Sequence, residues 1–406
     1  MRNWCARARK RRSSASNWRL TAAVCAPGCR SEQPAVDEPK ADEADATELR
    51  TPPPQPPPLL GELGRVSVDG KPFALALDGQ GQLVVSTMRG RAAAYLVAPD
   101  APLGAAPAAL ELDDFASSPL LLADGVFALP LFERKQLLLA RAAAGKLELL
   151  GSFTLPGKPA GAAMAWRQLW IALRENAEGV CLVAFDPASG ALQRSLRCDA
   201  TPVELASEGP PGAETLLLTL LASDAKHGEL ARLRTADGEL ARSAVDGVPL
   251  HAVTLGATTW LRRHERPDLL PLGESLQPSA ALELPFAPSL LRPLGDPERA
   301  TALLAVSANG HAAIIDAGAS PAVRHHRELL PGISDLVVER SGARFLALDA
   351  KRQSLCLYRS SELQELACAA LASQVGRVAW DELRGRAYVS LPEREEIVVL
   401  GVARGE

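Results

Sequence analysis

Short apolar segments followed by polar turns recur along most of the chain at a nearly constant spacing. After a few polar residues most of them are followed by a second apolar run, and this arrangement is typical of a β-hairpin. Successive segments begin 41 to 47 residues apart, at residues 83, 127, 170, 217, 260, 304, 346 and 387. The sequence therefore predicts eight strand-rich repeats.

Prolines run in phase with these segments. Proline lacks the amide hydrogen that a sheet ladder needs, so it is tolerated mainly at the first residue of a strand. A proline precedes or opens the earlier strand in six units, at Pro72, Pro119, Pro159, Pro202, Pro249 and Pro288. Two periodic features thus support the same repeat.

A repeat of roughly 43 residues that holds four short strands has the size of a β-propeller blade. The last unit, residues 375–402, stops after three strands, whereas residues 64–68 precede the first unit and have no other sheet. We expect this N-terminal segment to complete the last blade and to close the ring, which removes exposed sheet edges. The prediction is an all-β chain with a single propeller of eight four-stranded blades over residues 63–406. Seven blades is the alternative if the degenerate unit at residues 249–285 packs irregularly.

Two stretches resemble the YVTN-type propeller repeat of secreted bacterial proteins. They are Gly-Lys-Pro-Phe-Ala-Leu-Ala-Leu-Asp at residues 70–78, which leads to residues 83–86, and Val-Ala-Trp-Asp at residues 378–381, which leads to residues 387–390. The similarity covers roughly residues 64–402, with degenerate repeats. This group includes binding proteins as well as lactonase-like and quinoprotein-like enzymes, so the resemblance implies a fold and leaves the activity open.

The first sixty residues differ from the repeats in composition. Residues 1–29 begin with a basic stretch, continue with a short apolar one and end in Ala-Pro-Gly-Cys. This order is that of a bacterial export signal, and its ending resembles a lipoprotein signal, which implies lipidation of Cys29. Residues 30–62 are acidic and then rich in proline, a composition that favours a disordered tether. We expect an exported protein of the periplasm or outer envelope, which contacts the membrane only through a lipidated N-terminus.

The charge of the repeats argues against nucleic acid as a partner. Residues 1–30 carry eight basic side chains and no acidic one, which leaves 36 basic and 48 acidic side chains in the rest of the chain. A protein that binds phosphate backbones shows the opposite balance. We expect a monomer that binds a protein or a small anionic ligand at the face of the central channel.

Residues that carry chemistry are sparse. The six histidines show no metal-binding spacing, and no phosphate loop, nucleophile elbow or haem-attachment motif occurs. We therefore predict no cofactor, no metal ion and no catalytic residue. The turns after the second strands, which share one face of a propeller, each hold a basic or imidazole side chain. We call these residues the rim and predict that they bind an anionic ligand or partner: Arg89, Arg134, Arg174, His227, Arg263, His311, Arg352 and Arg394.

Two functions remain open. The first is a non-enzymatic binding or interaction scaffold on the cell envelope, which the tether and the missing catalytic residues favour. The alternative is an enzyme of the lactonase-like or quinoprotein-like type with its site at the channel mouth. That enzyme would need convergent carboxylates and a metal ion, or a quinone pocket with stacked aromatic rings.

Four of the seven cysteines fall on paired strands of the predicted blades. Cys181 and Cys198 lie on the third and fourth strands of one blade, and Cys356 and Cys368 occupy the equivalent strands of another. Opposed residues of antiparallel strands have Cβ atoms about 4.5–5.5 Å apart, close to the separation in a disulfide. We predict Cys181–Cys198 and Cys356–Cys368 disulfides, which suit an oxidising compartment. The alternative is that all four are small buried thiols.

Overall fold

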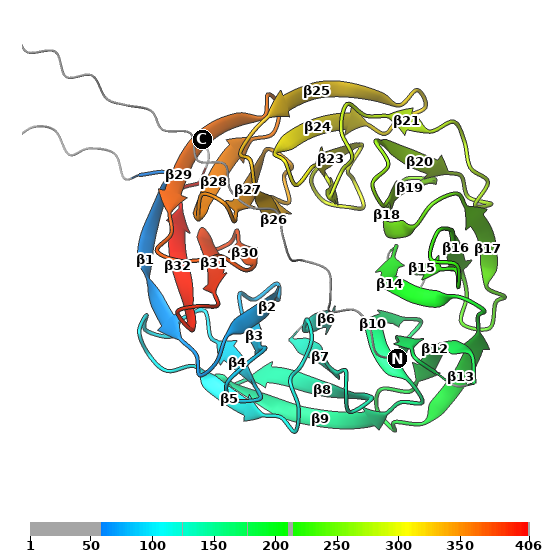
Figure 1. Cartoon of the computed structure of the whole chain (residues 1–406). Helices are drawn as coiled ribbons and strands as arrows, with labels where there is room; N and C mark the ends of the chain where they lie inside the picture. The colour runs from blue at the N-terminus through cyan, green and yellow to red at the C-terminus, as the bar shows by residue number, and fades with distance from the viewer. Residues whose placement is uncertain (1–57, 124, 177, 210–213, 405–406) are drawn as a thin grey trace, which may run out of the picture. The chain divides into compact units, whose positions relative to one another are not determined.

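The computed structural model describes residues 58–404 apart from 124, 177 and 210–213, and every regular element among them is a β-strand. The strands form eight antiparallel sheets of four, which are arranged as blades in a ring (Figure 1). The predicted eight-bladed propeller is confirmed. No helix long and apolar enough to span a bilayer occurs in this part of the chain.

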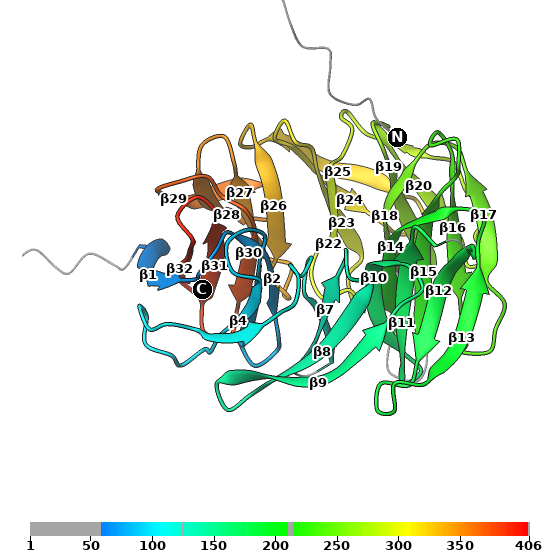
Figure 2. The same cartoon turned by 60° about the horizontal axis from the view of Figure 1, so that its bottom comes forward.

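The blades are numbered in chain order, and the first strand of each blade lies nearest the central channel (Figures 1 and 2). Blade 1 holds β2 (Pro72–Leu77), β3 (Leu83–Thr87), β4 (Ala93–Val97) and β5 (Ala108–Glu111). Blade 2 holds β6 (Leu120–Ala123), β7 (Val126–Leu131), β8 (Gln136–Ala143) and β9 (Lys146–Thr154). Blade 3 holds β10 (Lys158–Ala165), β11 (Gln168–Arg174), β12 (Val180–Phe185) and β13 (Leu192–Arg197). Blade 4 holds β14 (Thr201–Glu208), β15 (Thr215–Leu221), β16 (Gly228–Leu233) and β17 (Ala241–Val245).

The second half of the ring follows the same order. Blade 5 holds β18 (Pro249–Leu255), β19 (Thr258–Arg263), β20 (Asp268–Leu272) and the two-residue β21 (Leu282–Glu283). Blade 6 holds β22 (Leu290–Pro293), β23 (Ala302–Val306), β24 (His311–Asp316) and β25 (Ala322–Glu328). Blade 7 holds β26 (Ile333–Val338), β27 (Arg344–Asp349), β28 (Ser354–Arg359) and β29 (Gln364–Ala370). Blade 8 holds β30 (Val378–Asp381), β31 (Arg386–Leu391) and β32 (Glu396–Val402).

The ring closes through β1 (Leu60–Ser67), which is the fourth strand of blade 8. It pairs antiparallel with β32, from Leu60 opposite Val402 to Ser67 opposite Glu396. The strand begins four residues before the predicted segment at residues 64–68. An ion pair of 3.0 Å between Nη1 of Arg65 and Oε2 of Glu396 adds to this pairing.

The hydrophobic core lies between neighbouring blades. The second strands are buried on both faces, which explains their continuous apolar runs in the sequence, and Trp170 and Trp260 on two of them are fully buried. Between blades 4 and 5, for example, Leu217 and Leu261 belong to one buried cluster. The outermost strands are mainly exposed, as in β25.

A β-bulge interrupts the first strand at the same place in several blades. In blade 4 the register shifts between Pro202 and Glu204, and in blade 5 it shifts between Pro249 and His251. Blades 1, 3 and 7 show the same shift. A bulge redirects the side chains that follow it, so Glu204 and His251 occupy equivalent positions beside the channel.

Candidate functional site

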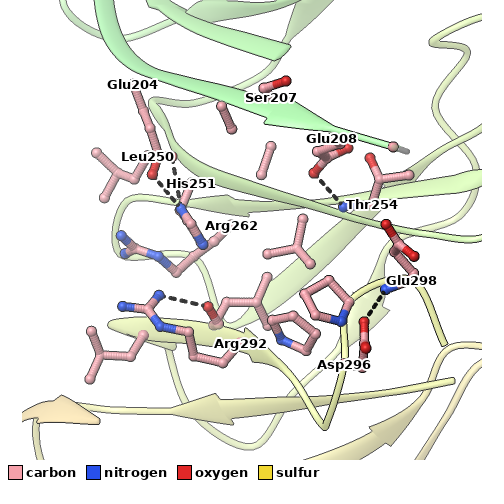
Figure 3. Close-up of a pocket in the computed structure, with 18 of the residues that line it drawn as sticks. Glu204, Ser207, Glu208, Leu250, His251, Thr254, Arg262, Arg292, Asp296 and Glu298 are labelled. Atoms are coloured by element: carbon pink, nitrogen blue, oxygen red, sulfur yellow. Dashed lines mark hydrogen bonds and ion pairs between the residues drawn. The ribbon is translucent and has the colours of Figure 1, made fainter. Parts of the chain in front are cut away.

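A cavity of about 1180 Å³ opens between the first strands of blades 4, 5 and 6 (Figure 3). Its walls are β14, β18 and β22, together with Arg262 from β19, the residues that follow β22 and Arg340 from the turn after β26. We call this space the inner cavity. Charged side chains of both signs line it, and they are divided between its two ends (Figure 3).

Glu204 and His251 meet at one end of the inner cavity. Both carboxylate oxygens of Glu204 lie 2.7 Å from Nδ1 of His251. The side chains are 35% and 22% exposed, so the pair borders the cavity without being buried. The contact joins blade 4 to blade 5 because each residue follows the bulge of its own first strand.

Two arginines lie beside this pair. Arg262 is opposite His251 in the ladder of blade 5, and its guanidinium lies on the same side of the cavity as that of Arg292 (Figure 3). Burial lowers the pKa of Arg262; the negative charge of Glu204 acts against this shift, and Arg292 adds to it. The buried Nε of Arg262 has no hydrogen-bond partner, and its Nη1 is 3.4 Å from the carbonyl oxygen of Pro288. Nη1 of Arg292 donates to the carbonyl oxygen of Leu291 at 2.9 Å.

The opposite end of the inner cavity is acidic. The backbone amide of Thr254 donates to Oε1 of Glu208 at 2.9 Å, and burial raises the pKa of Glu208. Asp296 accepts the backbone amide of Glu298 at 3.1 Å, and the side chain of Glu298 is exposed. Arg340 also lines the cavity, and its carbonyl oxygen accepts the backbone amide of Asp296 at 2.9 Å, so it lies at this end. The charge of the acidic end therefore comes from three carboxylates and one guanidinium.

The arrangement is suited to binding charged and hydrogen-bonding groups. Ser289, which also lines the cavity, donates its hydroxyl to the carbonyl oxygen of Val306 at 3.1 Å. Among the described residues, the side chains grouped closely enough to hold a metal ion are those of Cys356, Glu365 and Cys368, on β28 and β29 and outside this cavity. The two cysteines of that group are joined in a disulfide.

Five of the eight rim residues are exposed, and the other three are partly or fully buried. Arg89, Arg134, His227, Arg352 and Arg394 are exposed, as expected for turns. His227 lies 2.6 Å from Oδ2 of Asp224, and this hydrogen bond lowers the pKa of Asp224 to about 2.

The other three rim residues are partly or fully buried, and they lie on strands where the sequence predicted turns: Arg174 ends β11, Arg263 ends β19 and His311 begins β24. Arg174 donates to the carbonyl oxygens of Pro202 and Val203 in the next blade, at 2.6 and 3.0 Å. Arg263 is buried and pairs with Asp268 at 2.6 Å. His311 is partly buried, and its ring stacks on Phe286 with centroids 5.9 Å apart. Binding by the rim stays a prediction.

Both predicted disulfides are present. Cys181 and Cys198 join β12 to the segment after β13, with Cα atoms 5.5 Å apart. Cys356 and Cys368 are directly opposed on β28 and β29, with Cα atoms 4.1 Å apart. The predicted signal at residues 1–29, its Cys29, and nearly all of the predicted tether at residues 30–62 lie outside the described residues.

The sequence prediction missed the inner cavity. Its charged residues are spread over four repeats, and no local motif distinguishes them. A weak signal was available, because Glu204 and His251 each stand two residues after one of the prolines that mark the first strands.

Comparison with protein families and with curated proteins finds no match for this chain. Solved structures do match it over most of its length. BamB from Moraxella catarrhalis is 13% identical with a TM-score of 0.58, over 86% of this chain and 99% of that one. Sqt1 from Saccharomyces cerevisiae is 10% identical with a TM-score of 0.64, over 84% of this chain and 98% of that one.

A third structure is Sqt1 from Chaetomium thermophilum bound to the N-terminus of the ribosomal protein L10. It is 12% identical with a TM-score of 0.63, over 84% of this chain and 100% of that one. At these identities the similarity concerns the fold alone. The chain has the architecture of these proteins, and its blades make it an eight-bladed β-propeller.

Proposed function

We propose that this chain is a non-enzymatic binding scaffold of the cell envelope, and that it holds its partner in the inner cavity. The observation that carries the proposal is the cavity itself. Its volume of about 1180 Å³ exceeds that of an ordinary small-molecule pocket, which is roughly 300–1,000 Å³. Its walls combine charges of both signs with the free edges of three sheets, a combination that suits a protein partner.

The envelope location is supported by two features. Both disulfides suit an oxidising compartment, and residues 1–29 have the composition of an export signal. In this proposal the mature chain starts at Cys29 and is a monomer held to the membrane by a lipid on that residue. The resemblance to YVTN-type repeats of secreted bacterial proteins points the same way.

The exposed rim residues have a role in this proposal that complements the inner cavity. Arg89, Arg134, Arg352 and Arg394 place positive charge on turns of the ring. Charges of this kind raise the rate at which an oppositely charged partner arrives more than they raise its affinity. The rim would therefore attract an acidic partner, and the inner cavity would hold it.

A tryptophan placed in the cavity tests the proposal. Ser207 is exposed and lines the inner cavity, so Ser207→Trp fills the space without disturbing the core. Ser195→Trp, on the exposed outer strand of blade 3, is the matched control. The probe is a mixed-sequence library of 12-residue peptides, and bound peptides are counted by mass spectrometry.

We expect Ser207→Trp to remove most of the peptide binding and Ser195→Trp to leave it unchanged, with equal melting temperatures for the two variants. Library binding that survives Ser207→Trp would overturn the proposal. So would a wild-type protein that retains no peptide from the library.

A further inference from the structure

The charges of the inner cavity are separated along its length. Arg262 and Arg292 lie at one end with the Glu204–His251 pair, and Glu208, Asp296 and Glu298 lie at the other (Figure 3). A ligand that satisfies both ends must carry opposite charges at its own two ends.

The basic end has unused hydrogen-bond donors. Among the described residues, neither Arg262 nor Arg292 forms an ion pair with a carboxylate; the only acceptors they reach are the carbonyl oxygens of Pro288 and Leu291. The buried Nε of Arg262 has no partner at all, although buried polar groups in proteins are nearly always paired. A guanidinium group matches the geometry of a carboxylate through two parallel hydrogen bonds. This end therefore fits an acidic group.

The acidic end has unused acceptors. Glu208 and Asp296 each accept a backbone amide, from Thr254 and Glu298, and no described lysine or arginine forms an ion pair with Glu208, Asp296 or Glu298. Arg340 adds one positive charge nearby, but the three carboxylates outnumber it, so this end of the cavity is net acidic. This end fits a basic group.

The strands set the distance between the two ends. Glu204 and Glu208 are four residues apart on β14, and His251 and Thr254 are three residues apart on β18. A strand rises about 3.3 Å per residue, so the two ends are roughly 10–13 Å apart. That is the distance spanned by three or four residues of an extended peptide.

The backbone of the cavity walls favours a polypeptide over other ligands. β14, β18 and β22 are edge strands of their sheets, and an edge strand presents unpaired amide and carbonyl groups. An extended peptide pairs with such groups and places alternate side chains on the wall.

We propose that the inner cavity selects an extended peptide segment with an acidic and a basic side chain three or four residues apart, the acidic one bound by Arg262 and Arg292. This inference rests on the proposed function, because it names the chemistry of the partner that the scaffold holds.

The test uses fluorescein-labelled nonapeptides with blocked ends, made of serine and threonine with glutamate at the third position and lysine at the seventh. Three further peptides each carry one change. In the first, glutamate and lysine exchange positions; in the second, glutamine replaces glutamate; in the third, glutamine replaces lysine. Fluorescence anisotropy gives the affinity of each for the disulfide-bonded protein. We expect one of the two doubly charged peptides to bind about 10- to 100-fold more tightly than either singly charged one.

Variants assign each charge to its end of the cavity. Arg262→Gln with Arg292→Gln should cost the doubly charged peptide about 10- to 100-fold in affinity and should not affect the peptide that lacks glutamate. The double substitution Glu208→Gln and Glu298→Gln should likewise cost the doubly charged peptide about 10- to 100-fold in affinity, and it should not affect the peptide that lacks lysine. Arg299→Gln, an exposed arginine that does not line the cavity, is the control and should change nothing.

The outcomes separate this inference from the proposed function. Suppose that neither doubly charged peptide binds more tightly than the singly charged ones, while Ser207→Trp still removes most of the library binding. The inference is then wrong and the scaffold proposal stands. If Ser207→Trp leaves library binding unchanged, both the inference and the scaffold proposal are wrong. A peptide with phosphoserine in place of glutamate is the last arm, and a tenfold preference for it would overturn the assignment of the basic end to a carboxylate.

Discussion

Glu204 and His251, on the first strands of adjacent blades, face each other so that both carboxylate oxygens lie 2.7 Å from the same imidazole nitrogen. The pair joins two blades at the channel, and it also places a negative charge beside Arg262, whose pKa responds to it. Glu204 therefore competes with any acidic ligand group for the positive end of the inner cavity.

Replacing Glu204 should strengthen the binding of an acidic ligand. Glu204→Gln removes one negative charge near Arg262, and a partly exposed charge pair contributes about 0.5–1 kcal/mol. We expect the doubly charged nonapeptide to bind about two- to fivefold more tightly, measured by fluorescence anisotropy. Glu362→Gln, on an exposed turn of blade 7, is the control. Unchanged or weaker binding to Glu204→Gln would contradict the expectation.

Arg174 should contribute to stability, unlike the exposed rim residues. Its guanidinium donates to two carbonyl oxygens of the next blade, and hydrogen bonds from a charged donor contribute about 1.5–3 kcal/mol. Arg174→Ala should lower the free energy of unfolding in urea by about that amount. Arg89→Ala and Arg352→Ala, which remove exposed side chains, should change it by less than about 0.5 kcal/mol. Equal effects of all three substitutions would argue against a role for Arg174 between blades.

The disulfides should be detectable and stabilising. The denatured, unreduced mature protein should show no free thiol at Cys181, Cys198, Cys356 or Cys368 when treated with a thiol reagent. The bonds close loops with sequence separations of 17 and 12, for which chain entropy gives about 3 kcal/mol each. Replacing both cysteines of one pair by alanine should lower the free energy of unfolding by up to that amount. Four reactive thiols would refute both bonds.

Stability should depend on pH through Asp335. Burial raises the pKa of this carboxyl group, although the backbone amide of Val378 donates to it at 3.1 Å. A carboxyl whose pKa is higher in the folded state contributes stability below its unfolded pKa, about 3.9, and loses that contribution as the pH rises through the folded value. The free energy of unfolding of the wild type should therefore fall relative to that of Asp335→Asn between pH 4 and pH 7. Urea titrations at several pH values measure this difference, and a constant or rising difference would exclude it.

The N-terminus should be processed. If residues 1–28 form an export signal, the native protein begins at Cys29, carries a lipid there and partitions with membranes. Mass spectrometry of the N-terminal peptide from the native host decides this. An intact Met1 in the soluble cytosolic fraction would contradict it.

The blades could be predicted from sequence because every repeat carries the same local signals. In the first blade, for example, the pattern predicts strands at residues 72–77, 83–87, 92–97 and 108–112, which agree with β2 to β5 within one residue at each end. An apolar run between polar turns can be recognised without information from distant parts of the chain. The closing strand was also found, because residues 64–68 had no other sheet to join.

The candidate site could not be predicted in the same way. Glu204, Arg262 and Arg292 come from three different repeats, and only the curvature of the ring brings them to one cavity. The rim residues also show that the local sequence does not determine the environment of a side chain. Arg263 is the last residue of a second strand and Arg89 lies just after one, yet Arg89 is exposed whereas Asp268 and the carbonyl oxygen of Asp246 bind Arg263 in a buried position. Whether a turn residue is free depends on groups that the local sequence does not include.

The closure of the ring by β1 has a consequence for the order in which the protein forms. Arg65 and Glu396, which pair across the closing strands, are 331 residues apart, and contacts of such separation are slow to form. Apart from Arg340 of blade 7, the walls of the inner cavity come from blades 4 to 6, whose hairpins are local. We expect the walls of the inner cavity to fold during synthesis of the chain, before β1 pairs with β32 and closes the ring. The folding chain would then bind its partner before it reaches its full stability.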